Sequence, residues 1–267
     1  MFKLAGKEIE SRLLLGSAQY ESPEIMKKAI AASGTQVVTV SLRRQSPSKE
    51  GGKQFWNYIK ELSVHVLPNT AGCRTAREAI TTANMAREFF GTDWIKVEIT
   101  GDDYTLESNP FELVEANREL CRQGFCVFAY TSSSLSVASR LVEDGCNIVM
   151  PWASPIGSGQ GPSDLRALLT LRKRLPHITL IVDAGIGRPS DAVKVMELGY
   201  DAVLLNTAVA KAIDSENMAR AFKLAVQAGR IGYEAGVMEE RLSAMPSTPT
   251  VGTPFWQLAN YPLRSPN

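Results

Sequence analysis

Residues 180–208 read LIVDAGIGRPSDAVKVMELGYDAVLLNTA and predict a strand, a glycine-rich loop, a helix and a second strand. The two strands, Leu180–Asp183 and Ala202–Asn206, are short and almost wholly apolar, as is typical of parallel strands covered by helices. Between them, Pro189 is typical of a helix start, and Gly199 is typical of the left-handed residue that ends a helix. This segment predicts a wound α/β fold.

The same unit recurs along the chain, and three of its helices are expected to end in a glycine that is followed by a strand. Further strands are predicted at Arg12–Leu15, Val37–Ser41, Val64–Pro68, Trp94–Thr100, Cys126–Tyr130 and Ile148–Pro151. Helices are predicted at Pro23–Ala32, Thr75–Phe90, Pro110–Gln123, Ser134–Asp144, Ser163–Arg174, Ser190–Leu198 and Met218–Ala228. Eight strands alternating with helices predict a single (β/α)8 TIM barrel. No GxGxxG follows the first strand, which disfavours a dinucleotide-binding sheet.

Composition excludes several classes of function. The 29 Lys and Arg residues balance 28 Asp and Glu residues, and no basic stripe indicates a nucleic-acid partner. No apolar run approaches the ~20 residues of a membrane-spanning helix, and the N-terminus does not resemble a signal peptide. The four cysteines form no CxxC pair, and His65 and His177 are isolated, so we expect reduced thiols and no metal site. These features predict a cytoplasmic globular protein.

The composition changes near the C-terminus. We expect residues 1–241 to form the barrel domain and residues 242–267 to form an extended, flexible tail. That tail is rich in Ser, Thr and Pro and has few periodic apolar positions. The alternative is that the tail docks through its aromatic residues Phe255 and Trp256.

The fourth predicted barrel strand contains a lysine and a glutamate on one face. Strand alternation puts Trp94, Lys96 and Glu98 on that face, and Ile95 and Val97 on the face that helices would cover. We therefore expect Lys96 and Glu98 to point into the barrel. Burial favours the neutral, nucleophilic form of a lysine, so the pattern indicates catalysis. A structural ion pair is the alternative.

Glycine and small polar residues follow three neighbouring strands. These loops are residues 155–161, residues 183–187 and residues 206–208, at the barrel edge where phosphate commonly binds. We interpret them as a phosphate cradle, and on this interpretation Gly185→Val weakens phosphosugar binding without disturbing the fold. Asp183 would repel phosphate, so it is expected to act as an acid or base, with a turn role as the alternative.

Together these features indicate a phosphorylated carbonyl substrate. The expected chemistry is imine formation at Lys96, with protons moved by Glu98 and Asp183. An aldolase or isomerase acting on a phosphosugar would use the same groups without a sulfur donor. A binding scaffold without chemistry is a third alternative, although a scaffold has no need of an inward lysine.

Several long motifs in this order resemble thiazole synthase of thiamine biosynthesis, and the similarity runs from about Leu4 to Tyr233. The motifs are Asn69-Thr70-Ala71-Gly72-Cys73-x-Thr75-Ala76, Trp94-Ile95-Lys96-Val97-Glu98, Ile156-Gly157-Ser158-Gly159-x-Gly161, Val182-Asp183-Ala184-Gly185-Ile186-Gly187-x-Pro189-Ser190 and Asp201-Ala202-Val203-Leu204-Leu205-Asn206-Thr207-Ala208.

The resemblance implies a TIM barrel that condenses 1-deoxy-D-xylulose 5-phosphate, dehydroglycine (2-iminoacetate) and sulfur from a thiocarboxylated sulfur-carrier protein. It also implies an enzyme that supplies dehydroglycine, a homo-oligomer such as a tetramer, and no cofactor. The family's imine-forming lysine matches Lys96, and its acid/base carboxylates match Glu98 and Asp183. Its phosphosugar contacts match Gly157, Ala184, Gly185, Asn206 and Thr207.

The chain departs from the usual family sequence at three loops. Members commonly have Leu-Gly where this chain has Trp152-Ala153, and an acidic residue with proline within the segment 132–135. Residues 105–110 also differ from the usual loop. The positions matched to catalysis are intact, so the departures concern loop shape and partner docking.

Overall fold

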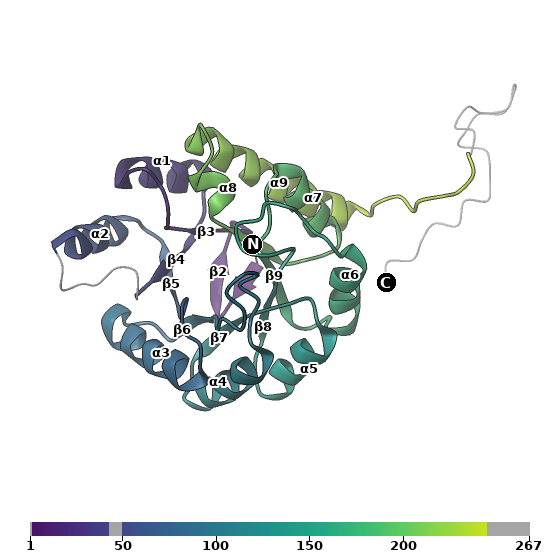
Figure 1. Cartoon of the computed structure of the whole chain (residues 1–267). Coiled ribbons are helices and arrows are strands. Elements are labelled where there is room, and N and C mark those ends of the chain that lie inside the picture. The colour runs from purple at the N-terminus through teal and green to yellow at the C-terminus, as the bar shows by residue number, and fades with distance from the viewer. Residues whose placement is uncertain (1, 43–49, 245–267) are drawn as a thin grey trace, which may run out of the picture. The chain divides into compact units, whose positions relative to one another are not determined.

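The computed structural model describes residues 2–42 and 50–244, in which eight parallel strands close into a barrel (Figure 1). Around the barrel the strands follow chain order, and the last one pairs with the first. The predicted TIM barrel is confirmed. Its strands are β3 (Leu13–Gly16), β4 (Val37–Ser41), β5 (His65–Asn69), β6 (Trp94–Val97), β7 (Cys126–Thr131), β8 (Ile148–Pro151), β9 (Thr179–Asp183) and β10 (Ala202–Leu205).

Helices surround these strands in the same order along the chain. They are α1 (Pro23–Ser33), α2 (Glu50–Glu61), α3 (Ala76–Phe90), α4 (Pro110–Arg122), α5 (Leu135–Glu143), α6 (Leu165–Arg174), α7 (Pro189–Glu197), α8 (Thr207–Ala210) and α9 (Ser215–Ala235). Polar side chains at several N-caps accept hydrogen bonds from the first turn, as at Ser22 and Thr75, and Gly34 and Gly199 have the positive φ expected after a helix.

Three helices and one strand differ from the elements that the sequence predicts. Helix α2 was not predicted, because its segment opens with two glycines that lower helix propensity. Helix α9 extends well beyond the predicted Met218–Ala228, and the segment expected to form a loop after the last strand contains the four-residue helix α8. The strand predicted at Trp94–Thr100 ends at Val97.

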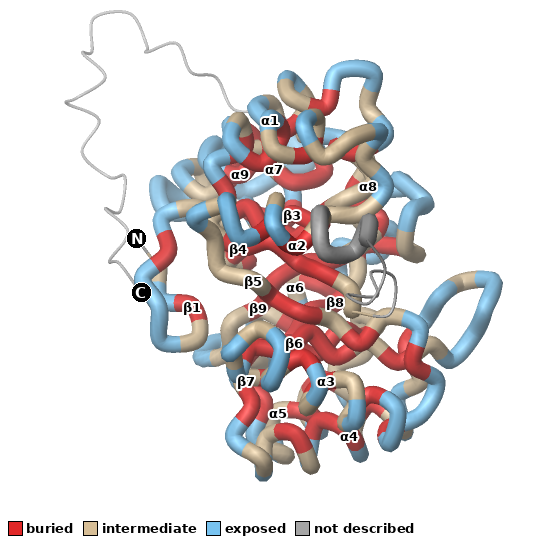
Figure 2. The backbone as a smooth tube through the Cα atoms, turned by 90° about the vertical axis from the view of Figure 1, so that its left-hand side faces the viewer, coloured by how far each residue is buried: buried red, intermediate tan, exposed pale blue. Residues whose placement is uncertain are grey.

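The apolar residues form two separate cores, one on each side of the barrel wall. The outer core lies between strands and helices, and the buried strands appear red beneath the helices in Figure 2. The inner core fills the barrel itself with one or two side chains from each of the eight strands: Leu14, Val37, Leu67, Trp94, Phe128, Ile148, Met150, Ile181, Ala202 and Leu204. The barrel interior is therefore packed rather than open, as is usual for this fold.

An antiparallel hairpin that the sequence did not reveal completes the inner core. Strands β1 (Phe2–Leu4) and β2 (Lys7–Ile9) pair with each other, and Leu4 and Ile9 are fully buried in the inner core. They belong to the same cluster as Val37 and Trp94, which are the first residues of β4 and β6. The hairpin therefore closes the amino-terminal end of the barrel and leaves the carboxyl ends of the strands for the site.

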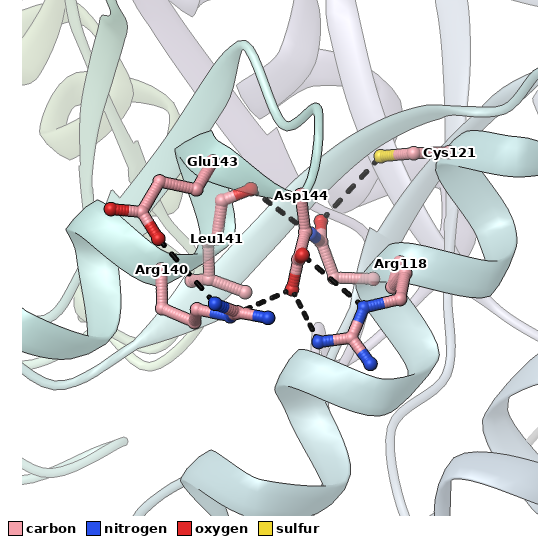
Figure 3. A network of polar contacts seen from close by, with 7 residues as sticks. Arg118, Cys121, Arg140, Leu141, Glu143 and Asp144 are labelled. Carbon is pink, nitrogen blue, oxygen red and sulfur yellow. Dashed lines mark hydrogen bonds and ion pairs between the residues drawn. The ribbon is translucent and has the colours of Figure 1, made fainter.

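A polar network joins α4 to α5 on the outside of the barrel (Figure 3). The Nδ2 of Asn117, which is buried, donates to the carbonyl of Leu141 at 3.1 Å. Arg118 reaches Asp144 with two nitrogens at 3.2 and 3.1 Å, and Arg140 reaches the same carboxylate at 3.3 Å. These contacts fix neighbouring helices and do not extend to the strand ends.

The chain divides into two compact units. The first spans Met1–Gly236 and contains the barrel, and the second spans Val237–Asn267. The boundary predicted between residues 241 and 242 falls inside the second unit, and residues 245–267 of the predicted tail lie outside the described residues.

Replacing Leu4 with alanine is expected to destabilise the barrel by about 2–5 kcal/mol, because it leaves a cavity in a closed apolar core. Urea denaturation measures this loss. The matched control is Glu8→Ala on the exposed side of the same hairpin, for which a change within about 0.5 kcal/mol is expected. Equal effects of the two variants would show that the hairpin does not close the barrel.

Candidate active site

A cavity of about 590 Å³ opens at the carboxyl ends of the barrel strands. Polar and glycine residues from the strand ends and the following loops make up much of its wall. All eight residues singled out in the sequence lie on this wall: Lys96, Glu98, Gly157, Asp183, Ala184, Gly185, Asn206 and Thr207. Strand ends that are distant in the sequence therefore meet at one place, as the barrel fold requires.

Lys96 lies between two carboxylates in this wall. Its Nζ is 2.5 Å from Oδ2 of Asp183 and 3.4 Å from Oε2 of Glu98. The lysine and Asp183 are buried, and their charged groups form an ion pair. When all three groups are ionised, the cluster carries one net negative charge.

Burial and charge act in opposite directions on these groups. Burial by itself lowers the pKa of Lys96, but the negative charges of Asp183 and Glu98 outweigh it, and the net pKa is raised above the ordinary value. Burial raises the pKa of Asp183 despite the adjacent ammonium, and the charge of Glu98 raises it further. The resting cluster therefore holds a protonated lysine beside a carboxylate that is more basic than an ordinary aspartate.

A threonine on the neighbouring loop holds the backbone of Glu98. Oγ1 of Thr70 accepts from the amide of Glu98 at 2.9 Å and donates to the carbonyl of Glu98 at 2.8 Å. This side chain takes the place of the strand partner, which explains why β6 ends at Val97 although the alternation of faces continues. Lys96 and Glu98 both face the cavity, and Ile95 belongs to the outer core, as predicted.

The glycine loops bring backbone segments into close contact. A Cβ at Gly185, where φ is +75°, would lie 2.6 Å from the backbone nitrogen and oxygen of Ser154. A Cβ at Gly187 would lie 2.3 Å from the carbonyl oxygen of Gly159. The expectation that Gly185→Val leaves the fold intact is therefore wrong. The two loops approach each other so closely at this position that a side chain does not fit, whether or not a ligand is bound.

Strain and unsatisfied polar atoms concentrate around the cavity. Ala184 has a φ of +71°, a conformation that is unfavourable for a residue with a Cβ. Within the described chain, two buried atoms on the wall have no polar partner: Oδ1 of Asn206 and Oγ of Ser41. Such atoms are costly unless something fills the cavity and bonds to them, which indicates a polar ligand.

Sequence reasoning missed several residues of the wall. Arg188, at the N-cap of α7, lines the cavity and makes no ion pair with any described residue. It stands at the unspecified position between Gly187 and Pro189 in the motif quoted above, and no local pattern indicates that it lines the cavity. Gly16 was missed as well, and a Cβ there would lie 2.6 Å from the side chain of Asn206.

Trp152 and Ala153, which differ from the usual family residues, contact residues of the site through their backbone atoms. Trp152 forms a parallel bridge with Asp183, and the amide of Ala153 donates to the carbonyl of Ala184 at 3.2 Å. Leu106, in the divergent loop 105–110, lines the cavity with a φ of +55°. These loops therefore shape the cavity without replacing a charged group.

The described part of the chain contains neither a clustered metal site nor a membrane-spanning helix. No group of three or more His, Cys, Asp and Glu residues among residues 2–42 and 50–244 is arranged to hold a metal ion, and the four cysteines, all within these ranges, form no disulfide. No described helix has the length and apolar character needed to cross a membrane.

Comparisons with known proteins agree on one family. A family model described as thiazole biosynthesis protein ThiG matches residues 3–249. The thiazole synthase of Rhodopseudomonas palustris (strain BisB18) is 61% identical over 256 residues, covering 96% of this chain and 98% of that protein. The thiazole synthase of Bradyrhizobium diazoefficiens is 60% identical with the same coverage.

A solved structure agrees with this assignment at lower identity. A chain of the BexX/CysO complex from Amycolatopsis orientalis matches with a TM-score of 0.81 and 30% identity, covering 90% of this chain and 98% of that one. The match in sequence and in fold extends over nearly the whole chain. The chain therefore belongs to the thiazole biosynthesis protein ThiG family.

Proposed function

We propose that this protein is a thiazole synthase of thiamine biosynthesis that works through an imine at Lys96. Its substrates in this proposal are 1-deoxy-D-xylulose 5-phosphate, dehydroglycine, and sulfur from the thiocarboxylated C-terminus of a carrier protein. Family membership and the high identity to thiazole synthases support the reaction. The observation that carries the mechanism is a buried lysine between two carboxylates in a polar cavity.

The phosphate of the sugar is proposed to bind at the glycine loops, with Gly157, Ala184, Gly185, Asn206 and Thr207 as contacts. Oδ1 of Asn206 has no hydrogen-bond partner among the described residues, so it can accept from a hydroxyl group of the sugar beside the phosphate. Arg188 adds the positive charge that an anion needs, since its guanidinium has no acidic partner among the described residues.

Imine formation requires Lys96 to lose a proton before it attacks the ketone. Asp183 is suited to accept this proton, because it lies 2.5 Å away and burial raises its pKa. Nζ then bonds to the carbonyl carbon, and the carbonyl oxygen gains protons and leaves as water. The resulting iminium acidifies the adjacent C–H, and Glu98 or Asp183 removes that proton as the ketone moves along the sugar.

The sulfur donor is proposed to enter at the carboxyl ends of the strands, because the hairpin fills the opposite end of the barrel. BexX, a relative at 30% identity, was solved in a complex with a second protein, CysO, which supports a protein partner here. A separate enzyme would supply dehydroglycine, and a homo-oligomer is proposed by analogy with the family.

Replacing Lys96 with arginine is expected to abolish covalent trapping of the phosphosugar by borohydride, because a guanidinium keeps the charge but forms no imine. Mass spectrometry of the reduced protein should find the added mass on the wild-type peptide that contains Lys96. Lys194→Arg, on the exposed side of α7, is the matched control and should trap fully. An adduct on another lysine would contradict the mechanism, and sugar turnover without thiocarboxylate would favour the aldolase or isomerase alternative.

Glu98→Gln is expected to make Lys96 reactive at lower pH. The charge of Glu98 helps to raise the pKa of Lys96, and only the neutral amine reacts, so removing that charge moves the reactive range downward. Trace acetylation across pH 7–11, followed by quantification of the Lys96 peptide, measures this shift. Glu98→Asp retains the charge and should keep the wild-type profile. An unchanged profile in Glu98→Gln would mean that Glu98 does not stabilise the ammonium.

Arg188→Gln is expected to weaken binding of 1-deoxy-D-xylulose 5-phosphate about tenfold, because one charge-assisted hydrogen bond is lost. Calorimetry in the Lys96→Arg background measures affinity without covalent reaction. Arg174→Gln, at the far end of α6, serves as the control. An equal loss of affinity for the unphosphorylated sugar would exclude a phosphate contact.

A further inference from the structure

Tyr130 is a buried polar residue next to the site that the mechanism above does not use. It lies near the end of β7 and is 1% exposed. Its hydroxyl has no hydrogen-bond partner within the described chain, and its side chain is not part of the cavity wall. No hydrogen bond within the described chain therefore accounts for a tyrosine at this position beside Lys96.

The ring of Tyr130 faces the amine of Lys96. Nζ lies over the ring, 5.3 Å from its centroid, within the range of a cation–π interaction. The other charged groups at Nζ are Asp183 from β9 and Glu98 beyond β6. On the remaining side, β5 pairs with Lys96 through the uncharged Asn69, and Arg188 lines the same cavity. The ammonium is thus held by two carboxylates and one aromatic face.

The hydroxyl of Tyr130 is unsuited to act as a base. Burial raises the pKa of Tyr130 far above its usual value, and the charges of Asp183, Glu98 and Glu107 raise it further. The phenol therefore stays protonated and the ring stays neutral near physiological pH. Its interaction with a cation consequently does not change when the neighbouring carboxylates gain or lose protons.

We propose that Tyr130 is a positioning residue for Lys96, whose ring holds the ε-amino nitrogen toward the cavity and stabilises its positive charge. The ring acts through the lysine and does not touch the substrate. This inference rests on the proposed function for its catalytic meaning, but the contact itself exists without substrate.

The charge balance of imine formation shows why such a partner is useful. An ammonium and a ketone give an iminium and water, so the nitrogen carries one positive charge before and after the reaction. A carboxylate that takes up a proton on the way becomes neutral and no longer balances this charge. The ring of Tyr130 does not titrate, and it continues to stabilise the cation while Glu98 or Asp183 is protonated.

Graded fluorination of the ring tests the proposal without changing its shape. Tyr130→Phe removes only the hydroxyl, and phenylalanine with one, two or three fluorine atoms at this position has a progressively weaker cation–π interaction. Trace acetylation of Lys96 across pH 7–11 is the measurement. We expect Tyr130→Phe to keep the wild-type profile, and the midpoint to fall with each fluorine by about half a pH unit or more in total.

The same series at Phe128 is the matched control. Phe128 lies two residues earlier on β7, is fully buried, and has its ring against Trp94 in the inner core. Fluorination there should leave the Lys96 profile unchanged. A flat response at position 130, equal responses at positions 128 and 130, or a shift in Tyr130→Phe as large as that of the trifluorinated ring would each overturn the proposal.

The acetylation profile needs no substrate, so it separates this inference from the proposed function. If the midpoint falls with fluorination while the wild type traps no sugar, the aromatic contact stands and the imine mechanism fails. If the wild type traps sugar on Lys96 while the profile is flat, the imine mechanism stands and the role of Tyr130 fails.

Discussion

An ammonium group buried in a protein costs several kcal/mol unless carboxylates lie within a few ångströms of it. Lys96 meets this constraint with Asp183 from β9 and with Glu98, which lies just beyond the end of its own strand. The two carboxylates must repel each other as well as attract the lysine, so the cluster is stable only while all three side chains are held in place. The closed barrel supplies that rigidity, because each group is attached to a strand or to a loop clamped onto one.

The barrel interior is divided by this constraint into an apolar part and a polar part. The amino-terminal part is filled by the inner core, which Leu4 and Ile9 of the hairpin complete. The carboxyl-terminal part contains the charged cluster and buried atoms that lack partners, such as Oδ1 of Asn206. The apolar inner core strengthens the electrostatic interactions of the charged cluster next to it, since charges interact more strongly when water is excluded.

The loops around the cavity show how backbone contacts and ligand recognition share the same residues. Gly185 is needed because Ser154 leaves no space for a Cβ, and Gly16 is needed because Asn206 occupies that space. Glycine in these loops is therefore not specific to phosphate binding, although the sequence pattern resembles a phosphate cradle. The guanidinium of Arg188, which makes no ion pair with a described residue, favours an anionic ligand, and the unpartnered Oδ1 of Asn206 is suited to accept a hydrogen bond from a hydroxyl group.

The sequence by itself determined the alternation of strands and helices, the inward orientation of Lys96 and Glu98, and the end of a strand at Asp183. Each of these features follows from local periodicity and turn chemistry. Only the tertiary structure decided that Asp183 lies 2.5 Å from Lys96, that Tyr130 faces the same amine, and that Arg188 joins the wall. Only the tertiary structure also shows the hairpin of β1 and β2, because strands of three residues are too short to have a periodic pattern. These features depend on barrel closure, which joins strand ends that are far apart in the chain, and no local pattern encodes a distance across the barrel.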